Sequence, residues 1–313
     1  MTIELVEPSP GTVHSPLPRA EHLTATPSLA GPTATSPLPL PTRHWGAAQA
    51  LLALDEARLS LPLHLPDATV ISALTTVVLR SGGAAVKVYP PGTDPAHLDL
   101  LAAALGGTST AHLPDGRPVV TSHGIVTVTP WLPAAPAVTW EETGALLRRF
   151  HTEHATADVP VWTPLSRLPS QVEGLPLDVA EVLLAARDAL LVALGEVRSE
   201  LGVGTIHGDV SPSNVMRTTA GPRLIDLDWV AVAPREYDLA AASRRVRDGE
   251  ISRQTYAGFC DAYGFDVLSW DGLPVLDRIA DLGGVAFRLW DCRHHGRDLD
   301  WVDAEARHWR TPL

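Results

Sequence analysis

The sequence predicts an α+β protein of two lobes, a small antiparallel β-sheet lobe followed by a mainly helical lobe. Three observations support this prediction. Between residues 75 and 130 short β-branched or apolar runs alternate with turn residues, whereas from residue 139 onward apolar side chains recur at helical spacing. The chain has 313 residues, 45% of them hydrophobic, which is enough to bury a core in each of two lobes.

Residues 1–41 differ in kind from the rest of the chain. They contain many Pro, Ser and Thr residues and end in the run Ser36–Pro41, which alternates Pro with Ser or Leu. This composition is typical of a disordered, polyproline-like tail, which acts as a plain tether or, as the alternative, binds an aromatic groove of a partner. The acidic start lacks the apolar core of a secretory signal, so none is expected.

Residues 42–132 are predicted to form the N-terminal lobe. Thr75–Leu79 and Ala84–Tyr89 are strand-like runs, and the turn residues between them predict an antiparallel hairpin. Asp94 and Pro95 are start signals for a helix that continues to Leu105. Further strands are expected over 117–121 and 124–129.

Lys87 lies in the second strand of this hairpin and is the only lysine in the chain. An ammonium group on an apolar strand is costly to bury without a partner, so a bound anion would explain its presence. The alternative is a lysine on an edge strand that points at water. The preceding segment 65–72 contains no glycine, so the hairpin is not preceded by a glycine-rich loop.

Residues 133–313 are predicted to form the helical C-terminal lobe. Thr139 and Glu142 have the spacing of a capping box, and apolar residues follow at helical spacing. A second long helix is expected over 178–201. The remainder from about residue 241 is also predicted to be mainly helical.

The segment from His207 to Asp226 is the strongest indication of function. Val215–Ile225 reads as a hairpin, so Asn214 and Asp226 at its two open ends should meet at one edge. Two oxygen ligands side by side suit Mg²⁺, and Asp209 on the preceding loop could accept the proton of an attacking hydroxyl. This spacing is the one that phosphoryl transfer needs. The alternative for each residue alone is an ordinary turn or cap.

Three motifs resemble the aminoglycoside phosphotransferase family, which includes choline-kinase-like enzymes and has a protein-kinase-like fold. They are H-G-D-x-x-x-x-N at 207–214, I-D-x-D at 225–228 and Y-D-L-A at 237–240. The resemblance implies that Asp209 is the catalytic base and that Asn214 and Asp226 bind Mg²⁺. It further implies that Asp238 is a buried carboxylate that braces the catalytic loop, with a helix N-cap as the alternative. Supporting roles are expected for His207 and Asp228.

The resemblance also implies a nucleotide site in residues 42–132. Ala85-Val86-Lys87 resembles the strand whose lysine pairs with the α- and β-phosphates. Backbone groups of a hinge at Thr129, Trp131 and Leu132 would meet the adenine. The helix after Asp94 has no glutamate to pair with Lys87, so Asp99, or less favourably His97, is expected to do so.

The amino-acid composition indicates which classes of partner the protein can bind. The formal net charge is −12 and no stripe of Lys and Arg is present, which argues against nucleic acid and favours a cationic substrate. No run is long enough to cross a membrane. The two cysteines, Cys260 and Cys292, have no metal-binding spacing and indicate a reducing cytoplasm.

The predicted function is therefore transfer of the γ-phosphoryl group of ATP, with GTP as the alternative donor, to a hydroxyl of a small molecule. Mg²⁺ is the expected metal. The alternatives are a kinase of the same fold for homoserine, choline, a sugar or a natural product, and a non-catalytic nucleotide-binding pseudokinase. The sequence leaves the oligomeric state open.

Overall fold

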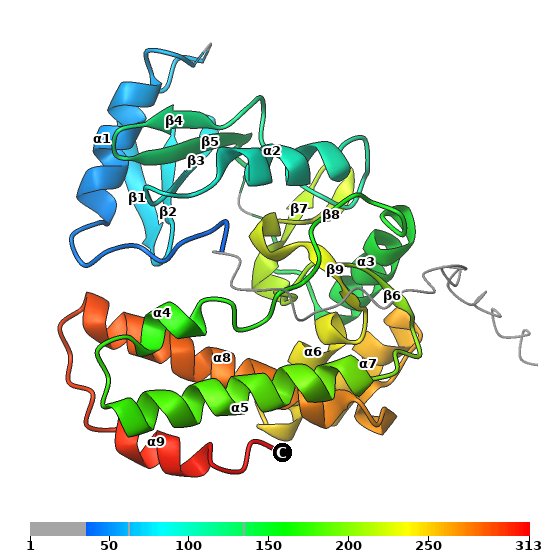
Figure 1. Cartoon of the computed structure of the whole chain (residues 1–313). Coiled ribbons are helices and arrows are strands. Elements are labelled where there is room, and N and C mark those ends of the chain that lie inside the picture. The colour runs from blue at the N-terminus through cyan, green and yellow to red at the C-terminus, as the bar shows by residue number, and fades with distance from the viewer. Residues whose placement is uncertain (1–35, 62, 134) are drawn as a thin grey trace, which may run out of the picture.

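The computed structural model describes residues 36–61, 63–133 and 135–313. The predicted α+β fold of two lobes is confirmed, with a sheet lobe above a mainly helical lobe (Figure 1). Within these residues no helix has both the length and the apolar character that a membrane span requires. The predicted disorder of residues 1–35 lies outside the described residues.

The first lobe is a five-stranded antiparallel sheet in the order β1-β2-β3-β5-β4. Because β3 lies in the middle of the sheet, Lys87 is not an edge-strand residue, and the alternative of a lysine pointing at water is wrong. Two helices flank the sheet (Figure 1). The elements are α1 (Ala47–Ala57), β1 (Ala68–Ala73), β2 (Val77–Ser81), β3 (Ala84–Tyr89), α2 (Pro95–Ala104), β4 (Val119–Thr121) and β5 (Gly124–Pro130).

The core of this lobe forms between the sheet and α1. Alternate residues of β2 and β3, such as Val77, Leu79, Val86 and Val88, are fully buried in one cluster with α1. Lys87 lies between two of these residues, and since side chains alternate along a strand, it points to the opposite face. The alternation that buries the valines therefore directs the lysine toward the second lobe.

The second lobe is built around helices that pack on each other. The capping box predicted at Thr139 and Glu142 is present at the start of the first of these helices. Its elements are α3 (Trp140–Glu153), α4 (Leu168–Val172), α5 (Leu177–Glu196), β6 (Val203–Ile206), η1 (Pro212–Asn214), β7 (Val215–Thr218), β8 (Gly221–Leu224), η2 (Leu227–Trp229), β9 (Ala231–Pro234), α6 (Tyr237–Arg247), α7 (Arg253–Tyr263), η3 (Val267–Ser269), α8 (Leu273–His294) and α9 (Val302–His308).

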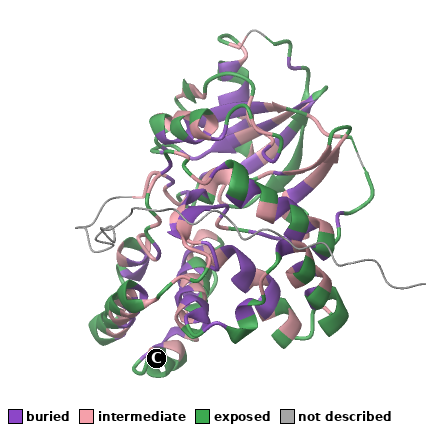
Figure 2. Ribbon diagram, turned by 90° about the vertical axis from the view of Figure 1, so that its right-hand side faces the viewer, coloured by how far each residue is buried: buried purple, intermediate pink, exposed green. Residues whose placement is uncertain are grey.

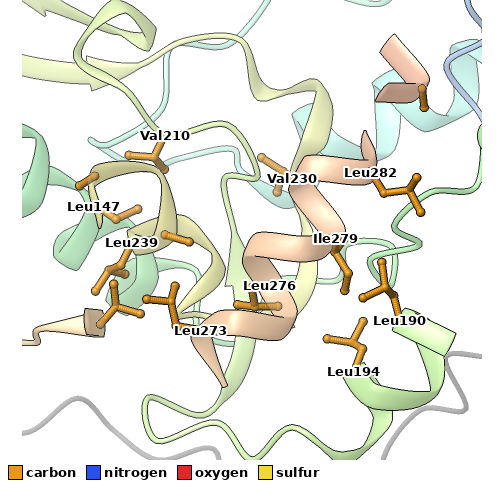
Figure 3. Packing of buried hydrophobic residues seen from close by; sticks show 14 of the residues in the cluster. Leu147, Leu190, Leu194, Val210, Val230, Leu239, Leu273, Leu276, Ile279 and Leu282 are labelled. Carbon is orange, nitrogen blue, oxygen red and sulfur yellow. The ribbon is translucent and has the colours of Figure 1, made fainter. Parts of the chain in front are cut away.

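Helix α8 runs through the centre of this core. Leu276, Ile279 and Leu282 lie along one side of it, and Leu190 and Leu194 of α5 face them (Figure 3). These side chains are all 3% exposed or less, so the helix pair is held by apolar burial. Figure 2 shows buried residues on the inward sides of these helices and exposed residues on the outward sides.

Residues 36–41, the last six of the segment expected to be a tail, contact both lobes. Leu38 is 6% exposed and belongs to a small apolar cluster of the first lobe. The indole Nε1 of Trp290 in α8 donates a hydrogen bond of 2.9 Å to the carbonyl oxygen of Pro41. This stretch therefore crosses from one lobe to the other.

Helices α3 and α7 approach each other closely at Gly144. A Cβ atom at this position would lie 2.5 Å from the carbonyl oxygen of Phe259, a backbone atom that cannot rotate away. We expect Gly144→Ala to lower the free energy of unfolding by about 1–3 kcal/mol because the two helices must separate. Urea or thermal unfolding measures this change.

The matched control is Gly284→Ala in the middle of α8, where an added Cβ meets nothing within 4 Å. There alanine should raise the free energy of unfolding by roughly 0.5–1 kcal/mol, since glycine is unfavourable inside a helix. Equal effects of the two substitutions would show that the close approach at Gly144 is not a constraint.

Candidate active site

The predicted hairpin is confirmed and forms the floor of the site. Strands β7 and β8 pair from Val215 opposite Leu224 to Thr218 opposite Gly221. At the open end the amide of Ile225 donates a hydrogen bond of 2.9 Å to the carbonyl oxygen of Asn214. Asn214 and Asp226 therefore lie at the same edge of the hairpin.

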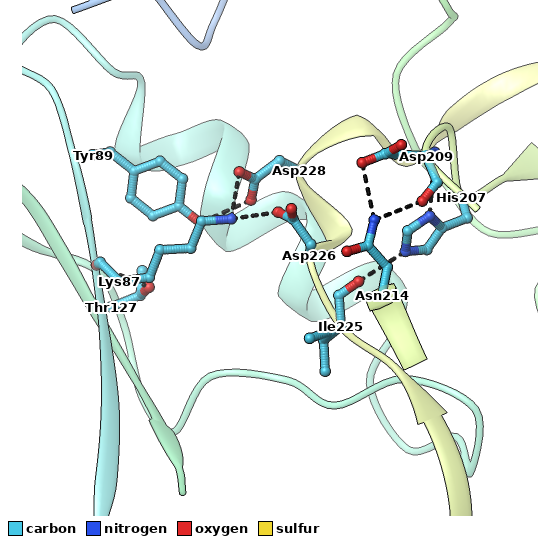
Figure 4. Close-up of polar contacts among 9 residues, drawn as sticks. All are labelled: Lys87, Tyr89, Thr127, His207, Asp209, Asn214, Ile225, Asp226 and Asp228. Atoms are coloured by element: carbon cyan, nitrogen blue, oxygen red, sulfur yellow. Dashed lines mark hydrogen bonds and ion pairs between the residues drawn. The ribbon is translucent and has the colours of Figure 1, made fainter. Parts of the chain in front are cut away.

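The catalytic loop is tied to this edge by side-chain hydrogen bonds (Figure 4). The amide nitrogen of Asn214 donates to the backbone oxygen of Asp209 at 2.8 Å and to its carboxylate at 2.9 Å. His207 Nε2 donates to the carbonyl oxygen of Ile225 at 2.9 Å. The loop and the residues before Asp226 therefore form one hydrogen-bonded unit.

Gly208 is required by the backbone of this loop. Its φ of 87° lies in the left-handed region, and a Cβ atom would lie 2.5 Å from the carbonyl oxygen of Trp229. A larger residue would push η2, and with it the aspartates of the I-D-x-D motif, away from the loop. This contact requires glycine at position 208.

Asp238 is the buried anchor of the catalytic loop. Its carboxylate accepts hydrogen bonds from the backbone amides of His207 at 2.6 Å and Gly208 at 2.8 Å. It also accepts from His151 Nε2 at 2.9 Å, and His151 Nδ1 pairs with the Tyr263 hydroxyl at 2.8 Å. Burial lowers the pKa of His151 against the opposing effect of Asp238, which favours the neutral imidazole as the donor in this contact.

The alternative in which Asp238 is a helix N-cap is wrong. Helix α6 begins at Tyr237, and its N-cap residue is Glu236. Asp238 is the second residue of the helix, which directs its side chain toward the loop. The backbone amides of His207 and Gly208 therefore donate to a carboxylate that is fixed in a helix.

Lys87 forms an ionic cluster with the I-D-x-D motif. Its Nζ donates to Asp226 at 2.5 Å and to Asp228 at 2.6 Å, and the Tyr89 hydroxyl donates to the other oxygen of Asp228 at 2.8 Å (Figure 4). Burial alone would lower the pKa of Lys87, but Asp228, Tyr89 and Asp226 together raise it well above its usual value. The same ammonium lowers the pKa of Asp226 against the opposing effect of its burial.

The expected ion pair between Lys87 and Asp99 is wrong. Within the described residues the carboxylates that contact the ammonium are those of Asp226 and Asp228. Asp99 is one methylene shorter than the glutamate of protein kinases, and two carboxylates of the second lobe already neutralise the lysine. His97 of the same helix is buried beside the backbone of Asp228, and its pKa is lowered by burial.

A cleft of about 560 Å³ opens between the lobes. Lys87 and Asp226 line one part of it, together with Asn214. Its other lining residues are largely apolar and include those of the predicted hinge, Thr129, Trp131 and Leu132. The backbone amide of Trp131 donates to Gly83 at 2.8 Å, so it is already engaged within the first lobe.

Desolvation by the surrounding protein raises the pKa of the Asp209 carboxyl, against the opposing effects of His207 and Asn214, although the residue itself is exposed. Asp209 lies next to the open end of the hairpin, within hydrogen-bonding distance of Asn214. Two participants in the site, Tyr89 and His151, were not predicted from the sequence. Only the position of Tyr89, two residues after Lys87 on the same face of β3, could have indicated that it shares a partner with the lysine.

The fold and the cleft define a class, that of small-molecule phosphotransferases with a kinase-like fold. The model of the phosphotransferase enzyme family, APH, matches residues 72–282, well over half of the chain. The chain belongs to this family.

Solved structures agree with this fold. An amicoumacin kinase bound to AMP-PNP and Ca²⁺ is 16% identical, with a TM-score of 0.62 over 84% of this chain and 93% of that one. A choline kinase from Streptococcus pneumoniae is 13% identical, with a TM-score of 0.56 over 85% and 99%. A choline/ethanolamine kinase family protein from Mesorhizobium loti is 16% identical, with a TM-score of 0.55 over 83% and 92%. Among curated proteins none matches.

We expect Asp238→Asn to lower the free energy of unfolding by roughly 2–3 kcal/mol, because charge-assisted hydrogen bonds to two loop amides are lost. An amide group offers only one acceptor oxygen to these donors. Denaturant unfolding of the variant measures the change.

The matched control is Asp248→Asn, an exposed residue at the C-cap of the same helix, which should change stability by less than about 0.5 kcal/mol. If both variants were equally stable, the contacts of Asp238 would contribute nothing to holding the loop.

Proposed function

We propose that the chain transfers the γ-phosphoryl group of ATP, with Mg²⁺, to a hydroxyl group of a small molecule, and that Asp209 is its catalytic base. The observation that carries this proposal is the hydrogen-bonded unit of Asp209, Asn214 and the backbone preceding Asp226. It lies at the end of the cleft lined by Lys87, Asn214 and Asp226, called the phosphate end because the phosphates of ATP would bind there. In it a proton acceptor lies beside two oxygen ligands.

The metal site is proposed at Asn214 and Asp226. The Asn214 amide uses its nitrogen on Asp209, which leaves its oxygen on the Asp226 side in Figure 4. An amide oxygen and a carboxylate are hard ligands, and they suit Mg²⁺, which keeps several waters and phosphate oxygens. When bound, the metal would neutralise charge on the β- and γ-phosphates.

The remaining roles follow from the positions of the side chains. Lys87 would donate to the α- and β-phosphates, and the hinge residues Thr129, Trp131 and Leu132 would contact the base. Asp209 would orient the acceptor hydroxyl and take its proton as the new O–P bond forms and the bond to the β-phosphate breaks. Most of the rate enhancement would come from positioning and electrostatics.

A cationic acceptor is supported by the formal net charge of −12 and by aromatic side chains around Tyr237, whose hydroxyl is close enough to Asp209 to be affected by its charge. Burial, and to a smaller extent nearby carboxylates including Asp209, raises the pKa of Tyr237 to about 12, so its hydroxyl stays neutral. The ring of Trp162 packs on that of Tyr237 at 4.4 Å. Aromatic faces next to a carboxylate favour an ammonium group. We therefore propose an amino alcohol or amino sugar as the acceptor, and the cytoplasm as its location.

A panel of hydroxyl compounds with and without amines, assayed by release of ADP, tests the acceptor class. Amine-bearing compounds should give ADP and a phosphorylated product, and neutral sugars should not. The connection between β1 and β2 contains no glycine, which motivates the alternative of a non-catalytic nucleotide-binding protein. Magnesium-dependent ATP binding without product across the panel would favour that alternative.

We expect Asp209→Asn to lower turnover by roughly two orders of magnitude or more, because the acceptor loses its base, while nucleotide still binds. Steady-state kinetics and nucleotide titration measure the two effects separately. Asp188→Asn, at an exposed carboxylate on α5, is the control and should keep full activity. Near-normal turnover of Asp209→Asn would rule out the assignment.

A further inference from the structure

Arg167, in the connection between α3 and α4, lies at the phosphate end of the cleft. It lines a hollow of about 50 Å³ together with Asp226, Asp228 and Trp229. This hollow adjoins the large cleft, since the two share five lining residues. These are Thr75, Thr76, Tyr89, Asp226 and Asp228.

The guanidinium group is held in one orientation. It stacks over the ring of Trp229, 4.5 Å from the centroid. Its Nε donates to the Ser36 hydroxyl at 3.3 Å, and its Nη2 donates to the carbonyl oxygen of Leu38. A guanidinium has five N–H donors, so donors remain for a further partner.

The charge of Arg167 is not compensated by an ion pair. Among the described residues no carboxylate lies within 4 Å of its guanidinium nitrogens, whereas Asp226 and Asp228 are both engaged by Lys87. Burial lowers the pKa of Arg167 to about 10, against the smaller effect of Asp228. A half-buried cation without a counterion is unfavourable, and an anion entering the hollow would compensate its charge.

The partners of Arg167 are themselves fixed to the first lobe. Leu38 packs with Tyr89 and Leu98 in a buried cluster. The backbone amide of Asp94 donates to the carbonyl oxygen of Pro37 at 2.9 Å. The guanidinium is therefore positioned by both lobes, as a group that acts on a ligand between them must be.

We propose that Arg167 binds the γ-phosphoryl group of the nucleotide as a second cation beside Lys87, and that Ser36 and Leu38 are positioning residues for it. The inference rests on the proposed function and deepens it. A planar guanidinium matches the oxygens of a phosphoryl group and stabilises the charge that spreads over them during transfer. Lys87, by contrast, would act on the α- and β-phosphates.

The test compares two nucleotides that differ in the γ-phosphate. In Arg167→Met, which keeps the apolar stem on Trp229, the Kd of Mg–AMP-PNP should rise about tenfold or more while the Kd of Mg–ADP changes by less than about twofold. Turnover should fall by about 100-fold. Arg297→Met, at a side chain 55% exposed, is the control and should change neither constant. Calorimetric titration measures both.

Ser36→Ala should raise the Kd of AMP-PNP by only a few fold, because it removes one hydrogen bond that orients the guanidinium. Equal weakening of ADP and AMP-PNP by Arg167→Met, or no weakening of either, would overturn the inference. A rise in the acceptor KM alone would also overturn it, since Arg167 would then recognise an anionic acceptor. The nucleotide titrations remain decisive even if the wild-type chain transfers no phosphoryl group, which separates this inference from the proposed function.

Discussion

The ionic cluster of Lys87 with Asp226 and Asp228 is the interaction on which the two-lobed site depends. It joins the middle strand of the first lobe to the segment that follows the hairpin of the second. Burying the Lys87 ammonium without a counter-charge would be costly, and so would burying Asp228, whose side chain is 13% exposed, without a cation; Asp226 stays 40% exposed. The cluster therefore sets the relative position of the lobes at the point where the phosphates would bind.

The carboxylates of the site are compensated in different ways, and this difference suits the different roles proposed for them. Asp238 is satisfied by backbone amides and a neutral imidazole, so it has no capacity left for a ligand. The Asp209 carboxylate receives one side-chain amide and is otherwise exposed, so it retains acceptor capacity. Asp226 faces a cation that phosphate groups can attract away from it. These differences fit the proposed roles, in which Asp238 is structural, Asp209 accepts a proton and Asp226 exchanges partners.

The sequence predicted what is local in the chain. His207, Asn214 and Asp226 lie within twenty residues, and a hairpin is enough to bring their ends together. The spacing of residues along the chain gave no information about contacts between residues that lie far apart in the sequence. Lys87 meets Asp226 across 139 residues, and the helix nearest in sequence offered Asp99 as a false partner. Arg167 lies in an irregular connection without periodicity, so nothing in its neighbourhood indicated that residues 36–38 would orient it. No pattern indicated helix α1 either.

The connection between β1 and β2 lacks the glycine-rich loop that binds phosphates in protein kinases, and side chains could take over its role. In that loop glycine allows backbone amides to approach phosphates closely, but here the connection from β1 to β2 contains Leu74, Thr75 and Thr76, and the amide of Leu74 is bonded to the oxygen of Thr76. Phosphate recognition must therefore rely on side chains. Two cations converge on this end of the cleft, and the hydroxyls of two threonines line it. Such a site depends strongly on each charged side chain, because few backbone amides are available to bind the phosphates as well.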